Sequence, residues 1–181
     1  SSKDRLRDEI RRVVERVREI SERVNKHNRD SVKRVEEESR RINKEIRKVV
    51  EDVDRMRRRV TDERVVKELV KTLRDVVRKV VEKHKKAVKE VRDNSKEAEE
   101  IHKKALDELR EVARRVIEML RKDGVPEEVL REIEKLVRDV EREVRESIER
   151  SKRLVKELEE RVKKSIDEIK KEVDDVERKL K

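Results

Sequence analysis

Apolar residues recur along most of the chain in alternating steps of four and three, and this spacing limits the fold more than any other feature. Beginning at Leu6, they fall at Ile10, Val13, Val17, Ile20 and Val24, the heptad pattern of an amphipathic helix. The regularity matters because 57% of the 181 residues are charged and only 31% are apolar, a mixture that is also typical of disorder. Strict periodicity favours long helices that share one narrow core.

Two interruptions divide this pattern into three helices. Near residue 60 the apolar line stops, and Thr61 offers a capping hydroxyl followed by the acids Asp62 and Glu63. Gly124 suits a left-handed position past a helix end, and Pro126 suits the first position of the next helix. We therefore predict helices over about residues 2–60, 62–122 and 126–180. Each would be roughly 80–90 Å long at 1.5 Å per residue.

Short turns between nearly equal helices define the predicted architecture. They favour one domain over residues 1–181, an all-α, long antiparallel up-down-up three-helix bundle with coiled-coil-like packing. The main alternative opens one hairpin and shares helices with a second copy of the chain.

Polar residues interrupt the three apolar lines at matching heights. Folding the chain about residue 61 and about Gly124 brings these interruptions opposite one another. We predict three buried polar layers, each with one histidine. The first contains Ser21, His102 and Ser147; the second His27, Asn28, Asn94, Ser95 and Ser151; the third Ser39, Asn43, His84 and Ser165.

Buried polar layers have two interpretations here. A buried polar group without a partner costs about 1–3 kcal/mol, so layers that pair only in one alignment would set the register of the helices. Alternatively, the histidines form a pH switch. A histidine that is buried while neutral has a folded pKa below its unfolded value, so stability present at pH 7 is lost as the pH falls below ~6.5.

The second predicted helix carries a further line of valines beside its main apolar line. These residues are Val70, Val77, Val81 and Val88. One interpretation is that they widen the buried face of the helix. The other is an assembly stripe where a second copy or another bundle docks, including open head-to-tail assembly.

The composition argues against site chemistry. A nucleophile needs an oriented base and an oxyanion site in a cleft, and a narrow bundle with a single glycine offers neither. The chain has no cysteine to bind a metal ion. When the chain is folded about residue 61, His27 lies about 10 Å from His102 and about 16 Å from His84 along the bundle axis, too far to share one ion. We therefore expect no enzymatic activity, cofactor, metal ion or small-molecule substrate.

The sequence also bears on location. It has no targeting signal and no apolar stretch near the ~20 residues of a membrane-spanning helix. We expect a soluble protein with no membrane partner, made by recombinant cytoplasmic expression, and the sequence determines no other localisation.

The net charge of +10 raises nucleic-acid binding as a weaker alternative. Residues 1–61 carry a net +7, residues 62–122 carry +5 and residues 123–181 carry −2. Basic clusters at residues 57–59 and 83–86 would attract phosphate. However, acids are interleaved throughout and no aromatic residue is present to stack on a base, so we expect only weak, salt-sensitive association.

Several features together carry a resemblance. They are the nearly equal helices, the turn DGVPEEVLREI, the Glu, Lys, Arg and Asp surface, the lack of Gln and aromatics, and the Ser, Asn and His layers. With these features the chain resembles de novo designed helical bundles with buried hydrogen-bond networks. The resemblance implies a structural or self-assembly scaffold without evolved biochemical activity, or a pH-responsive bundle or assembly. The implied partners are the chain itself, as a homo-oligomer or filament, or a designed partner.

Overall fold

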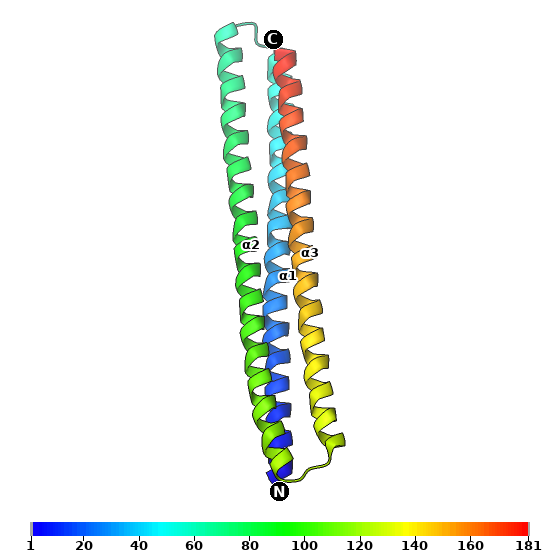
Figure 1. The fold of residues 1–181 in the computed structure, drawn as a ribbon. Helices are drawn as coiled ribbons and strands as arrows, with labels where there is room; N and C mark the ends of the chain where they lie inside the picture. The colour runs from blue at the N-terminus through cyan, green and yellow to red at the C-terminus, as the bar shows by residue number, and fades with distance from the viewer. Residues whose placement is uncertain (1, 181) are drawn as a thin grey trace. The chain divides into compact units, whose positions relative to one another are not determined.

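A computed structural model describes residues 2–180 as three long helices. Helix α1 spans Ser2–Arg57, α2 spans Glu63–Lys122 and α3 spans Glu127–Leu180 (Figure 1). The described residues contain no strand, and the predicted all-α three-helix bundle is confirmed. α1 ends before the predicted boundary near residue 60, whereas the other helix ends lie within one residue of prediction.

Contacts divide the described residues into two compact units, and each helix contributes a segment to both. Unit 1 contains residues 2–30 of α1 with residues 93–154, which form the α2–α3 hairpin. Unit 2 contains residues 31–92, which form the α1–α2 hairpin, with residues 155–180 of α3. Within each unit α1 and α3 run in the same direction and α2 runs opposite to them (Figure 1). Each unit is therefore a helical hairpin plus one helix.

The core of unit 1 contains the larger aliphatic side chains. Ile10, Leu109, Leu120 and Leu130 are each at most 1% exposed. Burying one such side chain contributes about 1.5–3 kcal/mol, which is why the periodic apolar positions turn inward despite the high charge. Beside them lie the valines of all three segments and the small Ala105.

The core of unit 2 is richer in valine. Leu73, Val91 and Leu158 are its most buried residues, at 0–1% exposure. Helix α1 contributes Val32 and Ile46 to this core. The buried face on α1 thus continues into unit 2, beyond Val24, where the heptad steps of its apolar line stop.

The loop from α1 to α2 corrects one predicted cap. The backbone N–H of Arg64 donates to Asp62 Oδ1 at 2.9 Å, which makes Asp62 the N-cap of α2. Thr61 precedes the cap. Both residue types suit this position, so the composition of the loop was insufficient to choose between them.

The loop from α2 to α3 is a Schellman motif. Val125 N–H donates to the Leu120 carbonyl and Gly124 N–H donates to the Arg121 carbonyl, each at 3.1 Å. Gly124 has a φ of 73°, the left-handed conformation predicted for it. Val125 packs against the core of unit 1, so the motif both ends α2 and covers the core beneath it.

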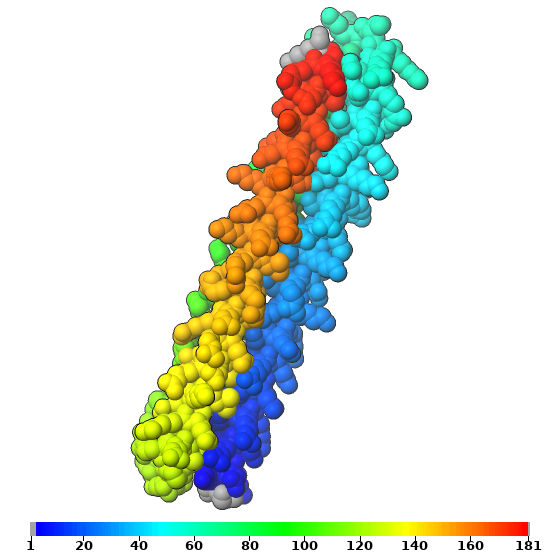
Figure 2. All heavy atoms as spheres, turned by 90° about the vertical axis from the view of Figure 1, so that its right-hand side faces the viewer, coloured from blue at the N-terminus to red at the C-terminus, as the bar shows by residue number. Residues whose placement is uncertain are grey.

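Ion pairs join α1 to α3 in both units. In unit 1, Arg18 Nε lies 3.1 Å from Glu143 Oε2; in unit 2, Arg161 Nη1 lies 2.5 Å from Glu36 Oε1. Figure 2 shows the face on which the surfaces of these two helices lie side by side in each unit. Such exposed pairs contribute about 0–1 kcal/mol each, so they supplement the apolar core.

None of the described helices combines enough length with enough apolar residues to cross a bilayer.

Candidate functional site: two buried histidine networks

A polar network lies inside unit 1, where α1, α2 and α3 meet. His102 Nε2 and Ser21 Oγ are 3.1 Å apart, and both residues are buried. One turn further along α1, Asn25 Nδ2 contacts Ser21 Oγ at 3.4 Å and also donates to Ser147 Oγ. Ser151 donates to Asn25 Oδ1 at 3.2 Å. The Asn25 amide therefore joins α1 to two serines of α3.

A matching network lies inside unit 2. His84 Nε2 is 3.0 Å from Ser39 Oγ, and His84 Nδ1 is 2.8 Å from the Val80 carbonyl oxygen. A carbonyl only accepts, so Nδ1 donates to it and the neutral ring accepts the Ser39 hydroxyl proton at Nε2. Asn43 Nδ2 donates to Ser165 Oγ.

The two networks share one spacing. Ser39, Asn43 and Ser165 follow their unit 1 counterparts by 18 residues, and His84 precedes His102 by 18. Eighteen residues are five turns of a helix with 3.6 residues per turn, so each counterpart returns to the same face. The same residue types therefore occupy equivalent positions in each unit. Among the described residues, Asn25 is hydrogen-bonded to Ser21 in unit 1, whereas Asn43 is not hydrogen-bonded to Ser39 in unit 2.

One substitution within this repeat leaves an atom without a partner. Asn43 Oδ1 is buried and has no hydrogen bond among the described residues. The position equivalent to Ser151, the donor to Asn25, is Ile169 in unit 2. Ile169 is buried, so unit 2 has an apolar contact where unit 1 has a hydrogen bond.

The environment of His102 disfavours its charged form. Burial lowers its pKa below the ordinary histidine value, and the Ala98 carbonyl, Ser21 and the charge of Glu99 offset part of that effect. Its Nδ1 is buried and makes no hydrogen bond of good geometry with a described residue. Protonation would place a charge where the cost of burial outweighs these favourable contacts.

The predicted middle layer is wrong in its histidine. His27 is exposed, whereas the next residue, Asn28, is 3% exposed. Consecutive residues on a helix point about 100° apart, so only one of them can face the core directly. Asn94 is also exposed, and its neighbour Ser95 is half-buried.

The buried Asn28 forms no part of either network. Its Nδ2 and Oδ1 have no hydrogen-bond partner among the described residues. Asn28 therefore forms no described side-chain hydrogen bond with Asn94, Ser95 or Ser151, the residues predicted to share its layer. Ser151 belongs instead to the unit 1 network, through Asn25.

Asn25 is the network residue that the sequence interpretation missed. It lies one residue beyond Val24, which had been assigned to the apolar line. The available signal was the repeat: Asn25 follows Ser21 by four residues, as Asn43 follows Ser39.

The valine line on α2 is part of the core of unit 2. Val77, Val81 and Val88 are each 7% exposed, and Val70 is half-buried. The hypothesis of an assembly stripe is wrong for the three buried valines, because α3 residues such as Val173 lie over this side of α2. The interpretation as a widened buried face agrees with this packing.

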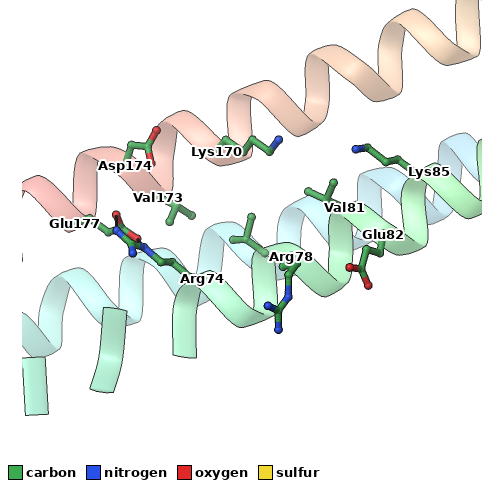
Figure 3. Close-up of a pocket in the computed structure, with 10 residues that line it drawn as sticks. Arg74, Arg78, Val81, Glu82, Lys85, Lys170, Val173, Asp174 and Glu177 are labelled. Atoms are coloured by element: carbon green, nitrogen blue, oxygen red, sulfur yellow. Dashed lines mark hydrogen bonds and ion pairs between the residues drawn. The ribbon is translucent and has the colours of Figure 1, made fainter. Parts of the chain in front are cut away.

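The surface between α2 and α3 forms shallow grooves within each unit. One groove in unit 2, of about 500 Å³, has Val81 and Val173 on its floor and charged residues on its rim (Figure 3). Over residues 2–180, no three His, Asp or Glu side chains lie close enough to hold a metal ion.

The comparisons with known proteins bear on the fold. No protein-family model matches the chain, and no curated protein matches it. A solved structure described as a computationally designed three helix bundle is similar, with a TM-score of 0.62 and 18% identity. The match covers 99% of this chain and 85% of that one. At this identity the likeness establishes the class of fold, a three-helix bundle.

Proposed function

We propose that the chain is a de novo designed structural scaffold whose two buried networks set the register of its helices. The observation that carries the proposal is the repetition of one Ser, Asn and His arrangement at an 18-residue spacing in both units. The likeness to a designed three-helix bundle supports a designed origin.

Hydrogen-bond energetics explain how the networks would act. Sliding one helix by a turn separates His102 from Ser21. Each buried polar group left without a hydrogen bond then destabilises the fold by about 1–3 kcal/mol. Valine positions alone would tolerate such a slip, because one valine can replace another in the same place. The networks therefore favour one alignment over several apolar alternatives.

The proposal includes no catalytic, nucleic-acid or assembly role. The described grooves are shallow, and many of their charged residues are paired, as Arg74 is with Glu177. The valine line that suggested self-association is buried within unit 2. The proposed role is therefore structural: with the register fixed, the residues on the surface of each helix keep constant positions relative to one another.

The test replaces the polar networks with apolar residues. The variant carries Val at the serines and asparagines and Leu at the histidines, at positions 21, 25, 39, 43, 84, 102, 147 and 165. We expect equal or higher unfolding free energy, because well-packed apolar residues often replace buried polar groups without loss. We also expect several sets of amide resonances in ¹H–¹⁵N spectra.

Single-network variants are the matched controls. Each should show heterogeneity only among the amides of its own unit. One sharp set of resonances from the fully apolar variant, at the parent's positions, would show that packing alone sets the register.

Acid response is a second candidate, favoured by the burial and depressed pKa of His102. The unfolded chain binds a proton at a higher pH than the folded chain does. Stability is therefore complete above about pH 6.5 and falls as the pH drops below that value, until the folded-state pKa is reached.

Helicity and molar mass between pH 8 and 4 test this candidate. We expect the parent to lose stability on acidification, and His102→Asn to remove part of that loss. His27→Asn is the control, because His27 is exposed and outside both networks. Equal pH profiles for the parent and His102→Asn would leave register as the only role of the histidine.

A further inference from the structure

The structural repeat exposes a difference between the units on the α2–α3 face. In unit 1, Glu99 lies between two lysines from different helices. Its Oε1 is 3.4 Å from Lys103 Nζ on α2 and 3.1 Å from Lys152 Nζ on α3. Hydrogen bonding to Lys152, followed by the effect of Lys103, lowers the pKa of Glu99 below its usual value. One carboxylate thus forms ion pairs with two ammonium groups, one from each side of the groove.

Unit 2 repeats the lysines without the carboxylate. Eighteen residues from Lys103 and Lys152 lie Lys85 and Lys170, and the position equivalent to Glu99 is Val81. Figure 3 shows the amino groups of Lys85 and Lys170 pointing toward one another across the groove, with Val81 lying between them. Neither lysine has an ion pair among the described residues.

Nearby acids do not replace the missing carboxylate. Glu82 and Asp174 line the same groove, and Asp167 lines the adjoining one. Within the described part of the chain, none of these three forms an ion pair with either lysine. The two lysines therefore line the groove without the carboxylate that Glu99 supplies at the equivalent place in unit 1.

The floor of this position is apolar, although each of its valine and isoleucine side chains is only 4–7% exposed. Val81 and Val173 line the groove of about 500 Å³, and the adjoining groove of about 570 Å³ has Val88, Val162 and Ile166 on its floor. Lys85 and Lys170 line both grooves, so the lysine pair stands where the two meet. A ligand complementary to this surface has one anionic head and an aliphatic tail.

Charge on the wider unit favours the same ligand. Residues 31–92 and 155–181 contain 31 Lys and Arg against 22 Asp and Glu, a net +9. Residues 1–30 and 93–154 contain 26 against 25, a net +1. An anion is therefore attracted to unit 2 more strongly than to unit 1.

We propose that the α2–α3 groove of unit 2 binds a medium-chain alkyl carboxylate. The carboxylate lies between Lys85 and Lys170, where Glu99 lies in the equivalent place of unit 1, and the alkyl chain covers the valine floor. This site is independent of the proposed role in register, because neither lysine belongs to a histidine network.

Decanoate below its micelle concentration is the probe, measured by calorimetry at pH 7.5 and by valine methyl shifts. We expect one site per chain, with shifts at Val81, Val88 and Val173. Acetate and decanol should each bind at least about threefold more weakly, because each lacks one half of the complementarity.

Two reciprocal variants test the equivalence of the units. Val81→Glu places an internal carboxylate between the lysines and should weaken decanoate binding by at least about tenfold, a loss of about 1.4 kcal/mol. Val81→Gln is its size-matched neutral control and should retain more affinity than Val81→Glu. Glu99→Val removes the internal carboxylate of unit 1 and should create a second site.

Surface variants keep the test valid if a core substitution unfolds the chain. Lys85→Met with Lys170→Met changes only exposed positions and should reduce the affinity for decanoate to that for decanol. Absence of decanoate binding to the parent, or equal binding to the parent and the double lysine variant, would overturn the proposal. If Glu99→Val binds only one decanoate, the grooves of the two units are not equivalent, and the proposal loses its basis.

Discussion

At the scale of single residues, the three asparagines of α1 illustrate different outcomes for a buried amide. Asn25 uses both its nitrogen and its oxygen in the unit 1 network. Asn43 uses its nitrogen but leaves its oxygen without a partner among the described residues. Asn28 leaves both atoms without one. The difference arises from the neighbouring helices, because all three residues are asparagines on the inward side of the same helix.

Replacing Asn28 with valine should stabilise the protein. The amide of Asn28 loses its hydration on folding without gaining a described hydrogen bond, a cost of about 1–3 kcal/mol that valine does not incur. Chemical denaturation followed by circular dichroism measures the change. Asn94→Val, at an exposed position, should change the unfolding free energy by less than about 0.5 kcal/mol. A loss of stability in Asn28→Val would show that the amide has an important partner, such as a bound water.

At the scale of helices and loops, an 18-residue period organises all three elements. In α1 the apolar line runs in heptad steps to Val24 and resumes eleven residues later at Val35, and seven plus eleven residues give five turns. Ion pairs between α2 and α3 follow the same period: Arg110 with Glu141, Arg92 with Glu159 and Arg74 with Glu177. A helix with this period keeps one face toward its neighbours without the twist that strict heptads require.

The end of α2 depends on the backbone of one glycine. Gly124→Ala should destabilise unit 1 by about 1 kcal/mol, because a left-handed φ of 73° strains any residue with a Cβ. Added bulk is not the cause, since a Cβ there would meet no heavy atom within 4 Å. Thermal unfolding of Gly124→Ala and Gly124→Asn distinguishes the two explanations. Asparagine tolerates this conformation better, so an equal or larger loss in Gly124→Asn would contradict the conformational explanation.

At the scale of the whole molecule, charge is distributed unequally between two units of similar construction. The net charges of +9 and +1 mean that like-charge repulsion acts mainly within unit 2. The networks and apolar cores, by contrast, occur in both. Whether the two units unfold together, as a single domain over residues 1–181, stays a prediction of the sequence.

Salt should therefore protect unit 2 more than unit 1. Added NaCl screens the repulsion between exposed lysines and arginines, whose influence extends about 10 Å at 0.1 M ionic strength. Native-state hydrogen exchange at low and high NaCl measures the effect at individual amides. We expect the larger gain in protection in residues 31–92. A larger gain in unit 1 would contradict the electrostatic explanation, and identical gains in every amide would show that the units open together.

The sequence alone determined that the chain forms three helices and, except for the end of α1, where they begin and end. Apolar periodicity selects the helix, and Gly124 and Pro126 separate α2 from α3 through restrictions on their own backbones. These are local properties, so no partner is needed to predict them. The alignment of Ser21 with His102 and of Ser39 with His84 was also predicted, because two short loops leave little freedom in which residues face each other.

Only the tertiary structure decided which of two adjacent polar residues faces inward. Asn28 is buried and His27 is exposed because the neighbouring helices cover one side of α1, and adjacent positions differ by about 100° around it. Asn25, one residue beyond Val24, is half-buried and reaches the serines of α3 for the same reason. The position of Lys85 and Lys170 along one groove likewise depends on how α2 packs against α3. Periodicity identifies a buried face, but the packed neighbours determine how far that face extends and which atoms find partners.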